Sequence, residues 1–326
     1  MRYNYASAFA PEMRRYIDLL VSEGRYISNI QGSLRSLDRY LTVNGLTQRI
    51  LEAETVSAWL KTKDVCSVTK AKHVSNVRGF SKHLASLGIE AGCPEAPVRR
   101  SDYVPYVFTD AELARIIAVA DNFKAGALLT RSALVFPILL RLLYCCGMRL
   151  GEGISLRWKD VDLERGILTV RKGKNLKERL LPVDASMTEL LKDYRAMTQS
   201  DGICGDYLFE SSRNPGSPFF KSTFHGWFKK AMDVAGIHYA RQSAWERGPC
   251  PHCLRHCFTL KSFMKSESEG RRFEESAPYL AAYLGHESPK ETEAYLSTNH
   301  SVYTQSHQRV DATLGYLFPE VNFDED

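Results

Sequence analysis

The chain has 326 residues, of which 44% are hydrophobic and 25% are charged, so it can bury a sizeable core and is not a disordered chain. At roughly 150 residues per domain, this length suggests two domains. The net charge is +5, but residues 1–100 hold 15 Lys/Arg and 9 Asp/Glu, against 28 and 29 in the remainder. A basic first third is typical of a module that binds a polyanion, although a solvated helical surface would show the same bias.

No segment predicts a secretory signal or a membrane span. The longest apolar run, residues 133–148, is interrupted by Arg141 and is too short to cross a bilayer, so it predicts a buried helix. Cys145 and Cys146 lie among apolar neighbours, which is typical of core thiols in a reducing compartment rather than of a disulfide framework. We therefore expect a cytoplasmic protein with no membrane partner.

Residues 1–92 predict an all-α domain, because apolar side chains recur at helical spacing and the segments end at turn residues such as Asn44-Gly45 and Gly88. The expected helices cover residues 9–20, 30–41, 54–63 and 74–87. The fourth helix and the residues just before it show a basic face made of Lys70, Lys72, His73, Arg78 and Lys82.

A linker is expected at residues 93–106, where prolines at 94, 97 and 105 disfavour helix and stiffen the chain. A second domain, residues 107–326, begins after it. Thr109 and Glu112 form a capping box there, in which the threonine caps a new helix and the glutamate reaches back to it.

The second domain is predicted to be mixed α/β, so the whole chain is mainly α with a small β-sheet or hairpin. Residues 167–170 and 179–183 are rich in β-formers and flank Lys172-Gly173-Lys174-Asn175, which predicts a β-hairpin. Further helices are expected at residues 134–146, 149–157, 186–198, 221–235, 253–265, 276–284 and 302–315.

Four motifs follow one another in this second domain. They are Cys146-Gly147-Met148-Arg149-Leu150-Gly151-Glu152, the Lys-rich hairpin, Pro251-His252-Cys253-Leu254-Arg255-His256, and Leu284-Gly285-His286 with Tyr295 nine residues later. In this order and spacing they resemble the tyrosine recombinases, the phage-integrase family of DNA breaking-and-joining enzymes, over about residues 109–300. Residues 1–92 resemble the family's core-binding domain in helical pattern only.

The resemblance assigns two arginines to the reacting phosphate. Attack on a phosphodiester gathers negative charge on the non-bridging oxygens, and a guanidinium can bind two such oxygens at once while it stays charged. Arg149 and Arg255 match the family's two phosphate-clamping arginines. Glu152 matches the acidic residue that orients the first arginine, and Asp160 matches an acidic residue with a structural role.

The resemblance also assigns the nucleophile and two histidines. A side-chain oxygen that stays bonded to DNA stores the bond energy, so that rejoining needs no ATP. Tyr295 stands at the matching position, and Tyr303 is its nearest competitor. His252 would act as an acid/base, and His286 would donate to a non-bridging oxygen, whereas His256 suits a structural role.

Lys174 matches the family's hairpin lysine, which protonates the leaving 5′ oxygen. Lys172 and Lys177 are close rivals, because hairpin register cannot be read surely from sequence, and both are expected to touch phosphates. On the N-terminal domain the same role is expected of Lys70, Lys72, Arg78 and Lys82.

The cysteines of Cys250-Pro251-His252-Cys253 suggest a metal site at first sight, but no second such pair exists and the reaction needs no metal or other cofactor. By resemblance the partner is a double-stranded DNA recombination site, held by a tetrameric synapse of this chain with possible accessory proteins. The tail after Tyr295 could dock on a neighbour or pack on its own chain. Residues 265–272 are expected to form an inserted polar loop.

Three alternatives stay open at this point. A type IB topoisomerase would share the chemistry but only relax DNA. A non-catalytic DNA-binding protein would keep the clamp without a nucleophile. A zinc-dependent binding module would rest on the cysteine cluster.

Overall fold

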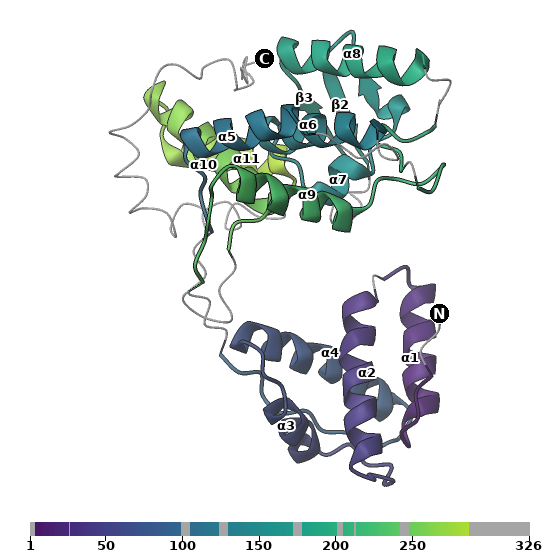
Figure 1. The fold of residues 1–326 in the computed structure, drawn as a ribbon. Coiled ribbons are helices and arrows are strands. Elements are labelled where there is room, and N and C mark those ends of the chain that lie inside the picture. The colour runs from purple at the N-terminus through teal and green to yellow at the C-terminus, as the bar shows by residue number, and fades with distance from the viewer. Residues whose placement is uncertain are drawn as a thin grey trace. The chain divides into compact units, whose positions relative to one another are not determined.

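The computed structural model describes residues 4–25, 27–98, 105–123, 130–171, 178–200, 205–211, 213–241 and 248–286. The chain forms two compact units, Met1–Asp102 and Tyr103–Asp326 (Figure 1). The division between them falls within the stretch expected to be a linker. None of the helices in the described ranges is long and apolar enough to cross a membrane.

The N-terminal unit contains the four predicted helices, which are confirmed. They are α1 (Ala10–Ser22), α2 (Ser28–Val43), α3 (Ala53–Lys61) and α4 (Ser67–Ser86). Their apolar stripes meet in one core, in which Met13, Leu34, Trp59, Val77 and Phe80 are fully buried. The helical periodicity of the sequence therefore records which face of each helix turns inward.

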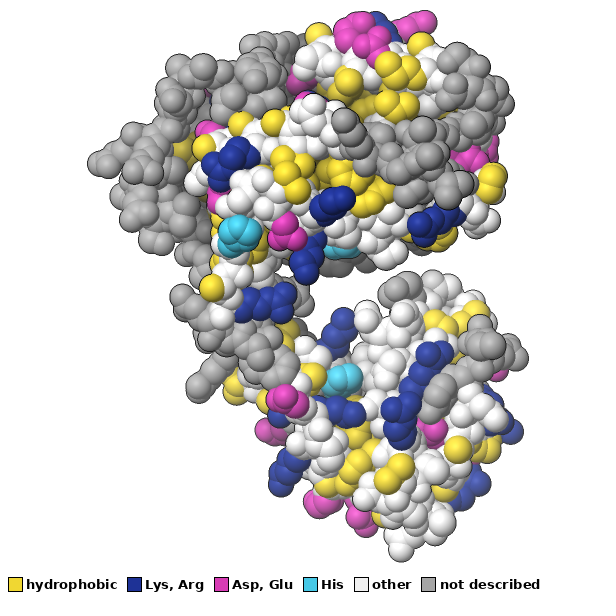
Figure 2. All heavy atoms as spheres, viewed as in Figure 1, with side chains coloured by type: hydrophobic (Ala, Val, Ile, Leu, Met, Phe, Trp, Pro, Cys, Tyr) yellow, Lys and Arg dark blue, Asp and Glu magenta, His cyan; other side chains and the backbone are white. Residues whose placement is uncertain are grey.

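The basic residues of α4 divide between surface and interior. Lys72, Arg78 and Lys82 are exposed, whereas Lys70 is half-buried in the first turn of the helix. His73 turns inward instead: its Nδ1 lies 2.9 Å from the Ser33 hydroxyl and its ring lies edge-on to Trp59. His73 therefore does not belong to the predicted basic face, because it packs between helices. Figure 2 shows Lys and Arg side chains, in dark blue, on the visible face of this unit.

The C-terminal unit is built around α6 (Thr130–Cys145), which packs against several other helices of the unit. The preceding helix, α5 (Asp110–Asp121), has the predicted capping box. The Thr109 hydroxyl accepts from the Glu112 backbone N–H at 3.2 Å, and the Glu112 carboxylate accepts from the Thr109 N–H at 2.8 Å. This cap fixes where the second unit's first helix begins.

The small sheet carries the predicted hairpin strands. It has three antiparallel strands in the order β1 (Val161–Asp162), β2 (Ile167–Val170) and β3 (Arg179–Pro182). Val170 pairs with Arg179, so the two arms are in register up to the turn. Residues 172–177, which form that turn in the sequence prediction, lie outside the described residues.

One predicted helix is shorter than expected. Instead of 149–157, α7 covers only Leu150–Ile154 and is followed by a 3₁₀ turn at Trp158–Asp160. Glycine is a poor helix former, and two of the five residues of α7 are glycines. The following backbone pairs elsewhere: the Leu208 N–H donates to the Leu156 carbonyl at 2.8 Å and the Trp158 N–H to the Asp206 carbonyl at 3.1 Å.

The remaining helices are α8 (Ala185–Ser200), α9 (Lys221–Val234), α10 (Pro251–Ser268) and α11 (Phe273–Leu284). The prediction of a polar loop over residues 265–272 is wrong in its first half, because α10 continues through Ser268. Lys265 and Glu269 lie 4.0 Å apart at helical spacing, and Gly270, at φ +85°, follows the end of the helix. The helix expected at 302–315 lies outside the described residues.

Candidate active site

Arg149 stands at the start of α7, where Glu152 holds it. The Arg149 backbone N–H and one guanidinium N–H each donate to the Glu152 carboxylate at 3.0 Å. Burial alone would raise the pKa of Glu152, but hydrogen bonds and charge from Arg179, together with the hydrogen bonds from Arg149, lower it to about 2. Glu152 is therefore ionised at neutral pH and fixes Arg149, whose side chain keeps 24% of its surface exposed.

Arg255 is fully buried within α10. Its guanidinium donates to the Gly147 carbonyl at 2.8 Å, to the Leu284 carbonyl at 2.7 Å, and to Nε2 of His286 at 2.9 Å. Carbonyl oxygens and an imidazole nitrogen orient a guanidinium without cancelling its charge. The contacts of Arg255 thus join the segment that leads to Arg149 with the segment that ends in His286.

Two glycines shape the backbone at these contacts. Gly147 has φ +55°, and a Cβ there would lie 2.4 Å from the Phe258 ring. Gly285, at φ +66°, ends α11 in the left-handed conformation immediately before His286. Only glycine adopts such a conformation without a steric cost, so the backbone favours glycine at both of these motif positions.

His286 is half-exposed, and its contact with Arg255 defines its tautomer. A guanidinium only donates, so Nε2 of His286 accepts, and the neutral ring carries its proton on Nδ1. Nδ1 is therefore the atom of this ring that can donate to a phosphate oxygen.

The first turns of α10 carry the other two histidines. His252 is exposed, and its ring lies edge-on to that of His256, with 4.8 Å between the centroids. Burial, and then the repulsion that His252, Arg255 and His286 exert on a protonated ring, lower the pKa of His256 to about 3. His256 thus stays neutral at physiological pH, which suits the structural role expected of it.

Cys250 precedes α10 and is half-buried, whereas Cys253 and Cys257 lie buried within the helix. Cys250 and Cys253 have their sulfur atoms 3.7 Å apart, and the Phe108 N–H donates to the Cys257 sulfur at 3.2 Å. Among the described residues, no group of three or more His, Cys, Asp or Glu side chains is arranged to hold a metal ion.

Asp160 lies at the base of the hairpin. Its buried carboxylate accepts from the Arg157 backbone N–H at 3.3 Å and from Arg171, the last described residue of the first arm. Arg171 also lies 3.6 Å from Glu178 on the other arm. Asp160 therefore anchors the hairpin and does not contact Arg149 or Arg255 in the contacts described.

The structure thus brings together Arg149, Glu152, Arg255 and His286, with His252 in the first turn of α10. The sequence prediction missed Arg179, whose guanidinium binds Glu152. The predicted nucleophile Tyr295, its competitor Tyr303, and the hairpin lysines Lys172, Lys174 and Lys177 all lie outside the described residues.

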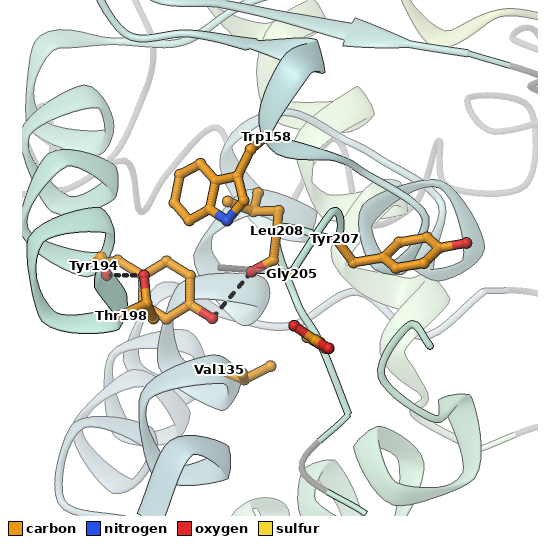
Figure 3. Close-up of a pocket in the computed structure, with 8 residues that line it drawn as sticks. Val135, Trp158, Tyr194, Thr198, Gly205, Tyr207 and Leu208 are labelled. Carbon is orange, nitrogen blue, oxygen red and sulfur yellow. Dashed lines mark hydrogen bonds between the residues drawn. The ribbon is translucent and has the colours of Figure 1, made fainter. Parts of the chain in front are cut away.

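None of the site residues that the structure describes lines the small pocket shown in Figure 3. Its lining consists of Val135, Trp158, Tyr194, Thr198, Gly205, Tyr207, Leu208 and Glu210. Trp158 stacks on Tyr194, whose hydroxyl donates to the Leu208 carbonyl at 3.1 Å. No predicted site residue in the described ranges lines this pocket, and two of its lining residues, Tyr194 and Thr198, belong to α8.

The chain is similar in sequence to known integrases and recombinases. The chain is 25% identical to the integrase/recombinase y4rB of Sinorhizobium fredii over 94% of its own length and 98% of that protein, and 28% identical to the tyrosine recombinase XerD of Pseudomonas putida over 62% and 64%.

Solved structures share the fold. A XerH site-specific recombinase in a post-cleavage complex with its difH substrate gives a TM-score of 0.64 at 18% identity, covering 85% of this chain and 80% of that one. A lambda integrase dimer bound to a core site gives a TM-score of 0.62 at 17% identity, and the match covers 87% of this chain and 94% of that one. The model of the phage integrase family matches residues 107–301, more than half of the sequence. With that match, the chain belongs to the phage integrase family, the tyrosine recombinases that break and rejoin DNA.

Proposed function

We propose that this chain is a site-specific recombinase that cuts duplex DNA through a 3′-phosphotyrosyl link to Tyr295 and rejoins it to a new partner strand. The observation that carries the proposal is the arrangement of Arg255. Its buried guanidinium binds the Gly147 carbonyl, two residues before Arg149, and both Leu284 and His286 at the end of α11. Two cationic groups and a donor imidazole are thus assembled by one set of contacts.

The proposed chemistry follows from these groups. The Tyr295 oxygen attacks the scissile phosphorus, the bond to the 5′ oxygen breaks, and Lys174 protonates that leaving oxygen. Arg149 and Arg255 stabilise the charge that develops on the non-bridging oxygens, and Nδ1 of His286 donates to one of them. His252 acts as acid/base at the same phosphate: it takes the phenolic proton of Tyr295 during cleavage and returns it during rejoining. Rejoining reverses these steps with a 5′ hydroxyl as the nucleophile, so the proposal requires neither metal nor ATP.

The proposed partner is double-stranded DNA. The net positive charge of residues 1–100 and the exposed Lys72, Arg78 and Lys82 support a clamp made by the N-terminal unit. Because DNA is the substrate, we expect the protein to act in the cytoplasm on the nucleoid.

The proposed assembly is a tetramer on two DNA sites. A lambda integrase tetramer has been solved on a Holliday junction, and it shares the fold of this chain with a TM-score of 0.61 at 17% identity. In the proposal, four copies of the chain, helped by accessory proteins, exchange strands in pairs.

A suicide-substrate experiment tests the proposed nucleophile. A pool of randomised duplexes, each nicked so that the short fragment with the freed 5′ hydroxyl diffuses away, traps a cleaving enzyme on the sequences it recognises. Wild-type protein should give a covalent adduct that survives denaturation, and Tyr295→Phe should give none. Tyr303→Phe is the matched control and should retain the adduct. An adduct formed by Tyr295→Phe but not by Tyr303→Phe would move the nucleophile to residue 303.

A further inference from the structure

Arg179, the first residue of β3, contacts two parts of the candidate site at once. Its two terminal nitrogens donate to the two oxygens of Glu152 at 3.2 and 2.7 Å, and its Nε donates to the Tyr283 carbonyl on α11 at 2.9 Å. Only 11% of the Arg179 side chain is exposed. A long side chain held by three hydrogen bonds in a nearly buried position has one conformation. Arg179 can therefore fix the position of Glu152 relative to the end of α11.

The carboxylate of Glu152 is shared between two arginines. It accepts from the side chains of both Arg149 and Arg179, and 7% of the Glu152 side chain is exposed. With Arg149 alone, the pair would be neutral and would offer little charge to a phosphate. With Arg179 added, the three side chains carry a net charge of one positive unit. Arg179 therefore both fixes the carboxylate and leaves the positive charge of Arg149 to act on the DNA.

The contact with α11 involves the end of the helix that leads to His286. Tyr283 and Leu284 are consecutive, and their carbonyls accept from Arg179 and Arg255 respectively. A Cβ at Gly285 would lie 3.2 Å from an Arg179 terminal nitrogen, so the backbone packs closely on this guanidinium. The same helix end thereby aligns both arginines.

We propose that Arg179 is a positioning residue that couples the hairpin arm to phosphate binding, because one guanidinium holds the carboxylate that orients Arg149 and the helix end that carries His286. This inference rests on the proposed function, in which Arg149 binds the scissile phosphate. Arg179 itself is not assigned a contact with DNA. Its effect on the reaction passes through Glu152 and α11.

The test compares two suicide substrates made on a sequence selected by the wild-type protein. One carries the normal scissile phosphodiester, and the other carries a methylphosphonate, in which a methyl group replaces one non-bridging oxygen and removes its charge. A clamp that stabilises this charge matters less for the neutral substrate. The ratio of single-turnover cleavage rates, phosphodiester over methylphosphonate, thus reports on the clamp, whereas a lower fraction of folded enzyme scales both rates equally.

Arg179→Met should slow phosphodiester cleavage about 10- to 100-fold, the range typical of residues that orient a ligating or catalytic group. It should slow methylphosphonate cleavage by a smaller factor, so that the ratio falls. Arg179→Lys keeps the charge but cannot make all three hydrogen bonds, so its ratio should lie between those of Arg179→Met and the wild type. If Arg179→Met does not fold, Arg179→Lys carries the test alone.

Arg171→Met is the matched control. Arg171 lies on the other arm of the same hairpin and binds Asp160 and Glu178 rather than Glu152. Its variant can slow cleavage but should leave the ratio at the wild-type value. An Arg179→Met ratio equal to that of Arg171→Met would overturn the inference.

Arg149→Ala separates this inference from the proposed function. If Arg149→Ala lowers the ratio and the Arg179 variants do not, only the role of Arg179 is wrong. If Arg149→Ala itself leaves the ratio unchanged, Arg149 does not bind the scissile phosphate, and the proposed site fails with it.

Discussion

Arg149 and Arg255 are held in different ways, and the difference has consequences for each residue. Arg149 is partly exposed and pairs with a carboxylate, whereas Arg255 is fully buried and binds carbonyls and an imidazole. Burying a guanidinium is costly unless its donors are satisfied, so Arg255 depends on the surrounding backbone for its position. Arg149 depends instead on Glu152, and through it on Arg179.

Replacement of Arg149 by alanine should reduce cleavage much more than DNA binding. Loss of one donor to a developing oxyanion lowers rates by about 100- to 1,000-fold, whereas one of many phosphate contacts contributes little to affinity. Single-turnover cleavage and DNA-binding titrations measure the two effects. Arg157→Ala is the control, because the Arg157 side chain pairs with Asp206 and contacts none of Arg149, Glu152, Arg255 and His286 in the contacts described. Cleavage unchanged by Arg149→Ala would remove Arg149 from the active site.

Glu152 should contribute a measurable pH dependence to stability. Its folded-state pKa, about 2, lies below the ordinary value of 4.5, so ionised Glu152 stabilises the fold above pH 4.5, and this stabilisation is lost as the pH falls towards 2. The advantage in unfolding free energy of wild type over Glu152→Gln should shrink by about 2 kcal/mol between about pH 6 and about pH 3. Urea unfolding at a series of pH values measures it. A constant difference across this range would contradict the paired state of Glu152.

At the scale of single residues, the motif residues could be predicted from the sequence, but the residues that bind them could not. Short spacings such as Arg149 to Glu152 lie within one helical turn, so their contact follows from the sequence. Arg179 meets Glu152 across 27 positions of sequence, and only the folded sheet and helices bring them together. The catalytic roles of all the motif residues, Tyr295, Lys174 and His252 among them, stay predictions.

At the scale of elements, the turn before α7 is the most constrained part of the site. Gly147→Ala should destabilise the protein by about 1–3 kcal/mol, because the new methyl group meets the Phe258 ring in a left-handed backbone conformation. It should also slow cleavage, since the Gly147 carbonyl binds Arg255.

Gly236→Ala is the matched control for that change. Gly236 has a similar φ of +67°, but nothing lies within 4 Å of a Cβ placed there. It should cost less stability than Gly147→Ala and leave cleavage at the wild-type rate. Thermal unfolding and single-turnover cleavage of both variants measure the comparison, and equal losses in the two would mean that the Phe258 contact is unimportant.

Element positions followed from the sequence more reliably than element ends. The stripes of α1 to α4, the Thr109 cap and the two hairpin strands were read from local patterns. The ends of α7 and α10 could not be read in this way. Helix α7 ends early because the backbone of Leu156 pairs with a distant segment, and α10 gains a further turn that ends at Ser268. The two-residue strand β1 is too short for any periodicity to reveal.

For the whole molecule, DNA binding should weaken steeply with salt, because each neutralised phosphate releases a counterion. Lys72→Ala and Lys82→Ala, both exposed on α4, should each reduce the slope of log affinity against log salt by about one. Titrations of labelled duplex at several salt concentrations give the slope. A change in affinity with no change in slope would mean that these lysines do not touch phosphates.

A plasmid with two selected sites distinguishes recombination from relaxation alone. We expect inverted or excised products from wild-type protein, because the proposed assembly exchanges strands between sites. Relaxed plasmid without such products would favour a topoisomerase.

The division of the chain into two units was suggested by its length and its prolines, but the order of assembly on DNA is not encoded in any local pattern.

The most direct measurement of the central claim is the mass spectrum of the trapped adduct. Trypsin should release residues 291–309, which contain both Tyr295 and Tyr303, so fragmentation must locate the attached nucleotide. We expect a 3′-phosphate ester on the phenolic oxygen of Tyr295. A nucleotide on Tyr303, or a link through the 5′ phosphate, would contradict the account.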